Sequence, residues 1–241
     1  MSPARRRILY IFFLLVMALH VAAWLQVRTA HARWMNVPPA PNGKGAEIFT
    51  LGDPQFAYRM TGVMLQNLGD TGGRSTAFKE YDYNHLAAWF NLAHGLDPRS
   101  DFVPMLAGFY FSSVDDPAKI APLAEYLHQV GNSTEGEKWR WLAQAVYLAR
   151  YKLKDMDKAY LWARELAAIP RPDLPAWTKQ MPAFVLNAGG DKQAAYDIMV
   201  EMLRSGKNKL PREEVNAMVY YICKRILDPG KAEQDPLCQD Q

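Results

Sequence analysis

The chain has 241 residues, with 28 lysine and arginine residues against 25 aspartate and glutamate residues, a formal net charge of +3. Five of the basic residues, and no acidic residue, fall within positions 1–33. The other 23 basic residues stand against 25 acidic ones, so residues 34–241 carry a net charge of −2. This balance argues against nucleic-acid binding, which needs a basic face on the folded domain. Two cysteines exclude a disulfide scaffold and a cysteine-rich metal module.

An uncharged apolar segment, residues 8–27 (ILYIFFLLVMALHVAAWLQV), is long enough to cross a bilayer as a helix. Arg5, Arg6 and Arg7 precede it directly, and basic residues are retained on the cytoplasmic side of a membrane. The sequence therefore predicts a transmembrane anchor at 8–27, a cytoplasmic basic stub at 1–7, and translocation of the residues that follow.

Two further features of this N-terminal segment concern its cleavage and its self-association. Ala30-His31-Ala32 has the small-x-small pattern of a signal-peptide cleavage site, so a signal peptide cleaved after Ala32 is the alternative. The apolar run is long for a signal sequence, which favours the uncleaved anchor. Ala18 and Ala22 stand at small-xxx-small spacing, which would let two anchors pack closely as a self-association site.

Beyond the anchor, the pattern is helical almost throughout, and no stretch predicts a sheet. Residues 28–52 are rich in proline and glycine and are predicted to be an extended linker. Residues 228–241 are polar with two prolines, which predicts a flexible tail. The fold class is therefore all-α, with a helical domain over 53–227. Its helices are expected at 53–68, 83–96, 101–112, 116–130, 135–153, 157–169, 174–188, 191–205 and 212–227.

Small and aromatic residues repeat at near-regular intervals in this domain. Leu86, Phe90 and Ala93 recur 34 residues later as Ile120, Ala124 and Leu127. The same pattern returns with longer intervals at Ala159, Ala163 and Leu166, and then at Ala195, Met199 and Met202. Over roughly residues 83–227 the chain thus resembles a degenerate tetratricopeptide-repeat (TPR) protein, a family with a repeat of ~34 residues. The resemblance implies an α-solenoid of helical hairpins that binds other proteins.

A narrower resemblance is to uncharacterised, membrane-anchored helical-repeat proteins of α-proteobacteria. It is carried by the runs YDYNHLAAWFNLAHGLDPRS (residues 81–100), EKWRWLAQAVYLARYKLKD (137–155) and LPAWTKQMPAF (174–184). This resemblance implies a bacterial inner-membrane protein and supplies no activity. Combined with the charge pattern, it predicts a single-pass protein with its N-terminus in the cytoplasm and its helical domain in the periplasm.

The sequence offers no credible catalytic, cofactor-binding or metal-binding residues. The histidines lack metal-ligand spacing, and His85 and His94 are expected to have structural or surface roles. No Ser/His/Asp order, Cys-x-x-Cys or His-Glu-x-x-His pattern is present. Cys223 and Cys238 either pair in an oxidising compartment or remain a buried thiol and a free tail thiol; the sequence leaves both open.

The domain is rich in aromatic residues, most of which are expected in the core. Trp139 and Trp141 are two residues apart, so on a helix they are not expected to face the same core. One of them is predicted to reach a surface or groove. The candidate partner-binding residues are therefore Trp139, Arg140 and Tyr147, on a concave peptide-binding face.

The sequence thus predicts a non-catalytic, membrane-anchored scaffold or assembly-assisting protein of the bacterial envelope, whose partners are other envelope proteins or peptides. No cofactor and no nucleic acid are expected. The alternatives are an envelope hydrolase or transferase on a helical scaffold, and a purely structural protein that forms a homodimer. The first alternative requires convergent acids or a nucleophile with a base, which the sequence does not display.

Overall fold

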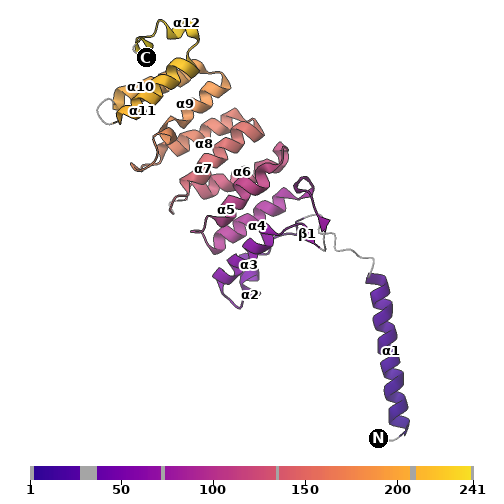
Figure 1. Ribbon diagram of the computed structural model, residues 1–241. Coiled ribbons are helices and arrows are strands. Elements are labelled where there is room, and N and C mark those ends of the chain that lie inside the picture. Colours follow the sequence, from indigo (N-terminus) through magenta and orange to yellow (C-terminus); the bar gives the residue numbers. More distant parts are fainter. Residues whose placement is uncertain (1–2, 28–36, 72–73, 134–135, 207–209, 240–241) are drawn as a thin grey trace. The chain divides into compact units, whose positions relative to one another are not determined.

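Figure 1 shows the chain as a computed structural model, which describes residues 3–27, 37–71, 74–133, 136–206 and 210–239. The chain divides into two compact units, residues 1–36 and 37–241. The predicted cleavage site at Ala30-His31-Ala32 lies outside the described residues. The described part is helical, apart from one pair of two-residue strands.

The first unit contains a single described helix, α1 (Pro3–Val27). Its segment Arg5–Gln26 is long and apolar enough to span a membrane, and the large apolar side chains from Ile8 to Leu25 are exposed. A side chain of this kind is stable in lipid and unfavourable in water. Ala18 and Ala22 lie on one exposed face of α1 together with Leu14, Met17, Val21 and Leu25. Self-association through this face stays a prediction.

The second unit is a succession of helices, several of which end in a wider π-helical turn or a tighter 3₁₀ turn (Figure 1). The α-helices are α2 (Gly43–Ile48), α3 (Pro54–Gln66), α4 (Tyr83–Leu96), α5 (Phe102–Met105), α6 (Pro117–Gly131), α7 (Trp139–Leu148), α8 (Met156–Ala168), α9 (Trp177–Gly189), α10 (Lys192–Gly206), α11 (Arg212–Tyr221) and α12 (Pro229–Ala232). The π turns are η2 (Leu106–Tyr110), η4 (Ala149–Leu153) and η5 (Ile222–Ile226), and the 3₁₀ turns are η1 (Phe78–Glu80), η3 (Phe111–Ser113) and η6 (Pro236–Cys238). Strands β1 (Asp70–Thr71) and β2 (Arg74–Ser75) pair antiparallel.

Aspartate side chains begin most of the longer helices. Asp53, Asp82, Asp116 and Asp155 each stand at an N-cap and accept hydrogen bonds from backbone N–H groups of the first turn. These N–H groups have no partner inside the helix, so each cap stabilises the helix by roughly 1 kcal/mol. The helices expected between residues 53 and 227 are accordingly present, with boundaries that differ by a few residues.

The helices pack in chain order, each against its neighbours along the sequence: α3 on α4, α4 on α6, then α6, α7, α8, α9 and α10 in succession. The residues that repeat in the sequence lie at these contacts. The repeating residues of the first three repeats, from Leu86 to Leu166, are all fully buried. In the fourth repeat, Ala195 and Met199 are fully buried and Met202 is half-buried. The repeating residues are thus core positions of the second unit. The core consists of a large cluster between Val37 and Val185 and a small one between Ala183 and Ile226.

The segment predicted to be a linker belongs in part to the folded unit. Val37 is only 3% exposed, and the backbone carbonyls of Val37 and Pro38 lie 2.7 Å from His85 Nδ1 and Trp89 Nε1 of α4. Residues 43–48 then form α2, capped by Asn42. Proline and glycine composition does not reveal this, because the segment is held by partners on a helix 50 residues away.

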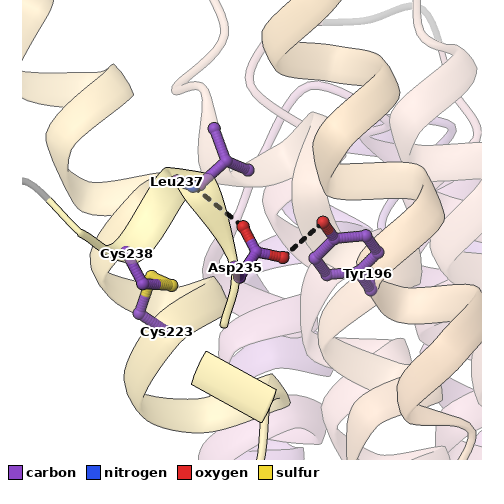
Figure 2. The surroundings of a disulfide bond; sticks show 5 residues. All are labelled: Tyr196, Cys223, Asp235, Leu237 and Cys238. Carbon is purple, nitrogen blue, oxygen red and sulfur yellow. Dashed lines mark hydrogen bonds between the residues drawn. A yellow bond between two sulfur atoms is a disulfide. The ribbon is translucent and has the colours of Figure 1, made fainter. Parts of the chain in front are cut away.

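The C-terminal tail is also not the flexible segment that its composition predicts, because it folds back over α10 and α11. Cys238 forms a disulfide with Cys223, with the two Cα atoms 5.7 Å apart (Figure 2). Asp235 accepts a hydrogen bond from Tyr196 Oη at 2.6 Å and also caps the turn η6. Tyr196 donates this bond to the Asp235 carboxylate, which is the main reason that the pKa of Tyr196 rises to about 12, and burial adds to the effect. The sequence left the pairing of the cysteines open, and the structure pairs them.

A buried lysine joins α7 to the segment that precedes α5. Lys138 is 1% exposed, and its Nζ lies 2.7 Å from both Asp101 Oδ1 and the carbonyl of Ser100, and 3.1 Å from the carbonyl of Arg99. Trp141 Nε1 donates to the same carboxylate oxygen at 2.7 Å. Burial alone would raise the pKa of Asp101, but the hydrogen bonds from Lys138 and Trp141 outweigh it and hold that pKa below its usual value.

We expect Lys138→Met to lower the free energy of unfolding by about 2–3 kcal/mol, because two backbone carbonyls and a carboxylate lose their buried donor. Lys158→Met is the matched control. Lys158 pairs with Glu125 at 2.6 Å, but both side chains are about a third or more exposed, so its loss should cost less than about 1 kcal/mol. Urea denaturation of both variants measures the difference. Equal effects would contradict the role given to Lys138.

Candidate functional site

The most distinctive surface lies on α5, α7, α9 and α11 and on the π turns η2 and η4. We call it the aromatic face. It is defined by the residues that line two neighbouring cavities. The first cavity, of about 520 Å³, is lined by Asp101, Phe102, Met105, Phe109, Arg140 and Trp141. The second, of about 400 Å³, is lined by Ala143, Val146, Tyr147, Arg150, Tyr151, Met181, Phe184, Val185 and Tyr221.

Helix α7 connects the two cavities, since one of its faces contributes to both. Arg140 stands in the first cavity, and Tyr147, two turns further along α7, stands in the second. Residues seven apart lie on the same face of a helix and about 10 Å from one another along its axis. The aromatic face is therefore an elongated surface rather than a single pocket.

Large aromatic side chains remain partly exposed along this face. Phe109 is 61% exposed, Tyr147 47% and Tyr151 52%, although each has an aromatic neighbour. The rings of Tyr147 and Tyr151 lie 4.8 Å apart, and the rings of Phe109 and Trp141 lie 6.0 Å apart. Exposed aromatic rings that are already held by neighbours lose little conformational entropy on binding, which makes them effective anchors for a partner.

The charge that remains available on the aromatic face is positive. Arg150 lies over the Tyr151 ring at 4.5 Å, and it is the only charged side chain among the lining residues of the second cavity. Arg140 is 66% exposed, and Glu137 lies 3.9 Å from its Nε. Glu137 is already engaged: hydrogen bonds from Arg171 first, and from Trp139 second, lower the pKa of its carboxyl group. In the first cavity, Asp101 is held by Lys138 and Trp141.

One of the two α7 tryptophans, Trp141, lines a groove, the first cavity, although both side chains are largely buried. Trp139 and Trp141 are 7% and 8% exposed. Trp139 packs against Trp177 of the α9 start, with ring centroids 5.7 Å apart, whereas Trp141 donates to Asp101 before α5. Because α7 has neighbours on two sides, two opposite faces of the helix are buried. Of the three candidate residues, Arg140 and Tyr147 lie on the aromatic face and Trp139 does not.

The sequence interpretation missed two members of this face, Arg150 and Tyr151, which lie on the π turn η4 that continues α7. Together with Arg140 and Tyr147 they follow a spacing of seven, three and one residues, which places them on one side of a helix. That signal was present in the sequence. The contributions of α9 and α11, in contrast, depend on tertiary packing.

The histidines occupy structural positions in the described part of the chain. His128 stacks on Trp162 with ring centroids 4.6 Å apart and bonds Glu165, so it joins α6 to α8. His94 is half-buried beside the Tyr126 ring, and burial, with Lys138 nearby, lowers its pKa. Within the described residues, no group of three or more His, Cys, Asp or Glu side chains is arranged to hold a metal ion.

Comparisons with known proteins do not place the chain in a family: no protein-family model, curated protein or solved structure matches it significantly.

Proposed function

We propose that this protein is a non-catalytic, membrane-anchored interaction module of the bacterial envelope, which binds segments of other envelope proteins on its aromatic face. The observation that carries the proposal is the row of half-exposed aromatic rings and two arginines along the aromatic face. Solenoid proteins bind partners along such extended surfaces. Binding of this type suits a scaffold or assembly-assisting role. The proposal is non-catalytic because the residues that line the aromatic face include no set of converging catalytic groups.

A TPR-like arrangement is part of this proposal. It is supported by the spacing of the second helices α4, α6, α8 and α10, which begin 34, 39 and 36 residues after one another. It is also supported by the small buried residues at the helix contacts, such as Ala93, Ala124 and Ala163. Solenoids bind partners along extended surfaces made by successive repeats, and the aromatic face extends over α5, α7, α9 and α11.

The proposed orientation places residues 1–7 in the cytoplasm and the helical domain in the periplasm. Arg5, Arg6 and Arg7 before the apolar helix favour it. The disulfide between Cys223 and Cys238 gives independent support, because structural disulfides persist in oxidising compartments and are rare in the cytosol. A reporter fused after residue 241 tests the orientation: a fusion active only in the cytoplasm would overturn it.

The chemistry of the aromatic face fits an extended peptide with apolar side chains and a carboxylate. Aromatic walls bury apolar groups, and an arginine beside an aromatic ring binds a carboxylate through its fixed fork of donors. In the second cavity, Arg150 lies beside Tyr147 and Tyr151 in this way. A second copy of the chain is the competing occupant, and size-exclusion chromatography with and without residues 1–33 distinguishes it.

We expect a photo-reactive benzoylphenylalanine at position 147 of the full chain, in native membranes, to crosslink to a reproducible set of envelope proteins. Adding Arg150→Glu should lower the yield of these adducts roughly tenfold, which corresponds to about 1.4 kcal/mol of binding energy. The control probe is at Leu161 of α8, an exposed apolar residue outside the aromatic face. The same adducts from position 161, or no effect of Arg150→Glu, would contradict the proposal.

A further inference from the structure

A cluster of apolar side chains projects into solvent at the start of the second unit, where α2 turns into α3. Ile48 is 74% exposed, Phe49 83% and Leu51 98%. We call these three residues the apolar turn. Helix α3 adds a stripe of half-exposed apolar residues at helical spacing, Phe56, Met60 and Val63, on the side opposite its core-facing Tyr58 and Leu65. Soluble proteins rarely expose apolar groups in such numbers without a partner.

The apolar turn has a well-defined conformation. Thr50 is 4% exposed, and its hydroxyl lies 3.0 Å from the carbonyl oxygens of both Glu47 and Asp53. The amide of Gly52 donates to the carbonyl of Glu47 at 2.8 Å. Leu51 has a φ of +56°, a left-handed conformation that is unfavourable for a residue with a side chain. The fold therefore holds a leucine in a strained backbone conformation and leaves its side chain in water, a combination that points to function.

The apolar turn lies close in sequence to the point where the anchor helix is attached. Nine residues, 28–36, separate the end of α1 from Val37, which is buried against α4. Fully extended, the ten peptide steps from Val27 to Val37 span at most about 36 Å. Helix α2, which leads into the turn, contacts both α3 and α4. If α1 spans a membrane, this tether keeps Val37 near that membrane, and the turn follows Val37 closely along the chain.

We propose that Ile48, Phe49 and Leu51 insert into the lipid surface of the membrane in which α1 is anchored, with the α3 stripe facing the headgroup region. The inference rests on the proposed membrane anchor. Apolar side chains at the tip of a tight turn enter the interface readily, and tethering raises their effective concentration at the lipid. This contact would fix the height of the helical domain above the membrane and leave the aromatic face accessible.

The charges on α2, α3 and the turn between them predict which lipids are needed. Lys44 and Arg59 are exposed, and they are balanced by Glu47 and Asp53. The insertion should therefore depend on apolar burial rather than on anionic headgroups, and it should persist in high salt. A zwitterionic phosphatidylcholine bilayer is accordingly a sufficient probe.

The test uses the full chain in phosphatidylcholine nanodiscs that contain one copy each. A nitroxide is attached in three single variants, Phe49→Cys, Met17→Cys and Glu201→Cys; the two native cysteines are paired and do not react. Paramagnetic relaxation by oxygen, which concentrates in lipid, is compared with relaxation by a water-soluble nickel chelate. Glu201 is exposed on α10 and reports the aqueous phase, whereas Met17 reports the anchor helix.

We expect the ratio of oxygen to nickel accessibility at position 49 to exceed that at position 201 at least threefold, with no change in 0.5 M salt. A ratio at position 49 equal to that at 201, with position 17 immersed in lipid, overturns the inference and leaves the anchor intact. A water-exposed position 17 overturns the anchor and the insertion together. A further set of nanodiscs contains two copies each. If position 49 is protected from the nickel chelate only in these discs, the turn forms a dimer contact and the inference is also overturned.

Discussion

Gly131→Ala is expected to lower the free energy of unfolding by about 3 kcal/mol, the upper end of the usual cost of overpacking a core. Gly131 is the last residue of α6, at its contact with α7. A Cβ at this position would lie 2.2 Å from the backbone nitrogen of Leu142 and 2.5 Å from its Cα. The obstacle is backbone, so no change of rotamer relieves it and the two helices must separate. Leu142 itself is fully buried, which extends the damage into the core.

Gly95→Ala is the matched control for this substitution. Gly95 lies in the last turn of α4, and a Cβ there would have no atom within 4 Å. Alanine loses less backbone entropy than glycine in a helix, so this variant should be more stable by about 0.5–1 kcal/mol. Urea denaturation measures the change in the free energy of unfolding for both variants. Changes of the same sign in Gly131→Ala and Gly95→Ala would contradict the close approach of α6 and α7.

The second large effect is expected at the C-terminus, where Cys238→Ser opens the disulfide to Cys223. The bridge closes a loop with a sequence separation of 15, and a loop of this length stabilises a protein by about 3 kcal/mol in the chain-entropy account. The effect should be local, because the bridge closes over the small core of Ala195, Met199, Ile222 and Ile226. Cys238 is the better position to change, since Cys223 is 6% exposed and a buried serine would add its own cost.

Amide hydrogen exchange of the full chain tests this prediction. The amides of residues 228–239 should exchange faster in Cys238→Ser by up to two orders of magnitude, which corresponds to about 3 kcal/mol. Those of α6 and α7, in the large core, should not change. Dithiothreitol should produce the same acceleration in the native chain and none in the variant. An acceleration spread equally over all helices would show that the two cores unfold as one unit.

Much of the helical architecture follows from local signals. Aspartates before helices, glycines after them and apolar residues at helical spacing act over a few residues, so the sequence placed the helices and identified core positions such as Leu86, Phe90 and Ala124 correctly. The membrane-length helix α1 is equally local, because its length and composition suffice. On the candidate site, Arg140 and Tyr147 line the two cavities of the aromatic face, and their role in binding a partner stays a prediction.

The remaining features depend on contacts between distant residues, which no local pattern specifies. Val37 is ordered by α4, and the tail by Cys223 and Tyr196, although both segments have the composition of flexible chain. Trp139 is buried because α7 has neighbours on two sides, a property of the packing and not of the helix itself. The cavity beside Arg150 exists only because α9 and α11 provide its other walls. The sequence by itself therefore determined the helices, including the membrane-length helix α1, whereas tertiary structure decided which of their residues form the aromatic face.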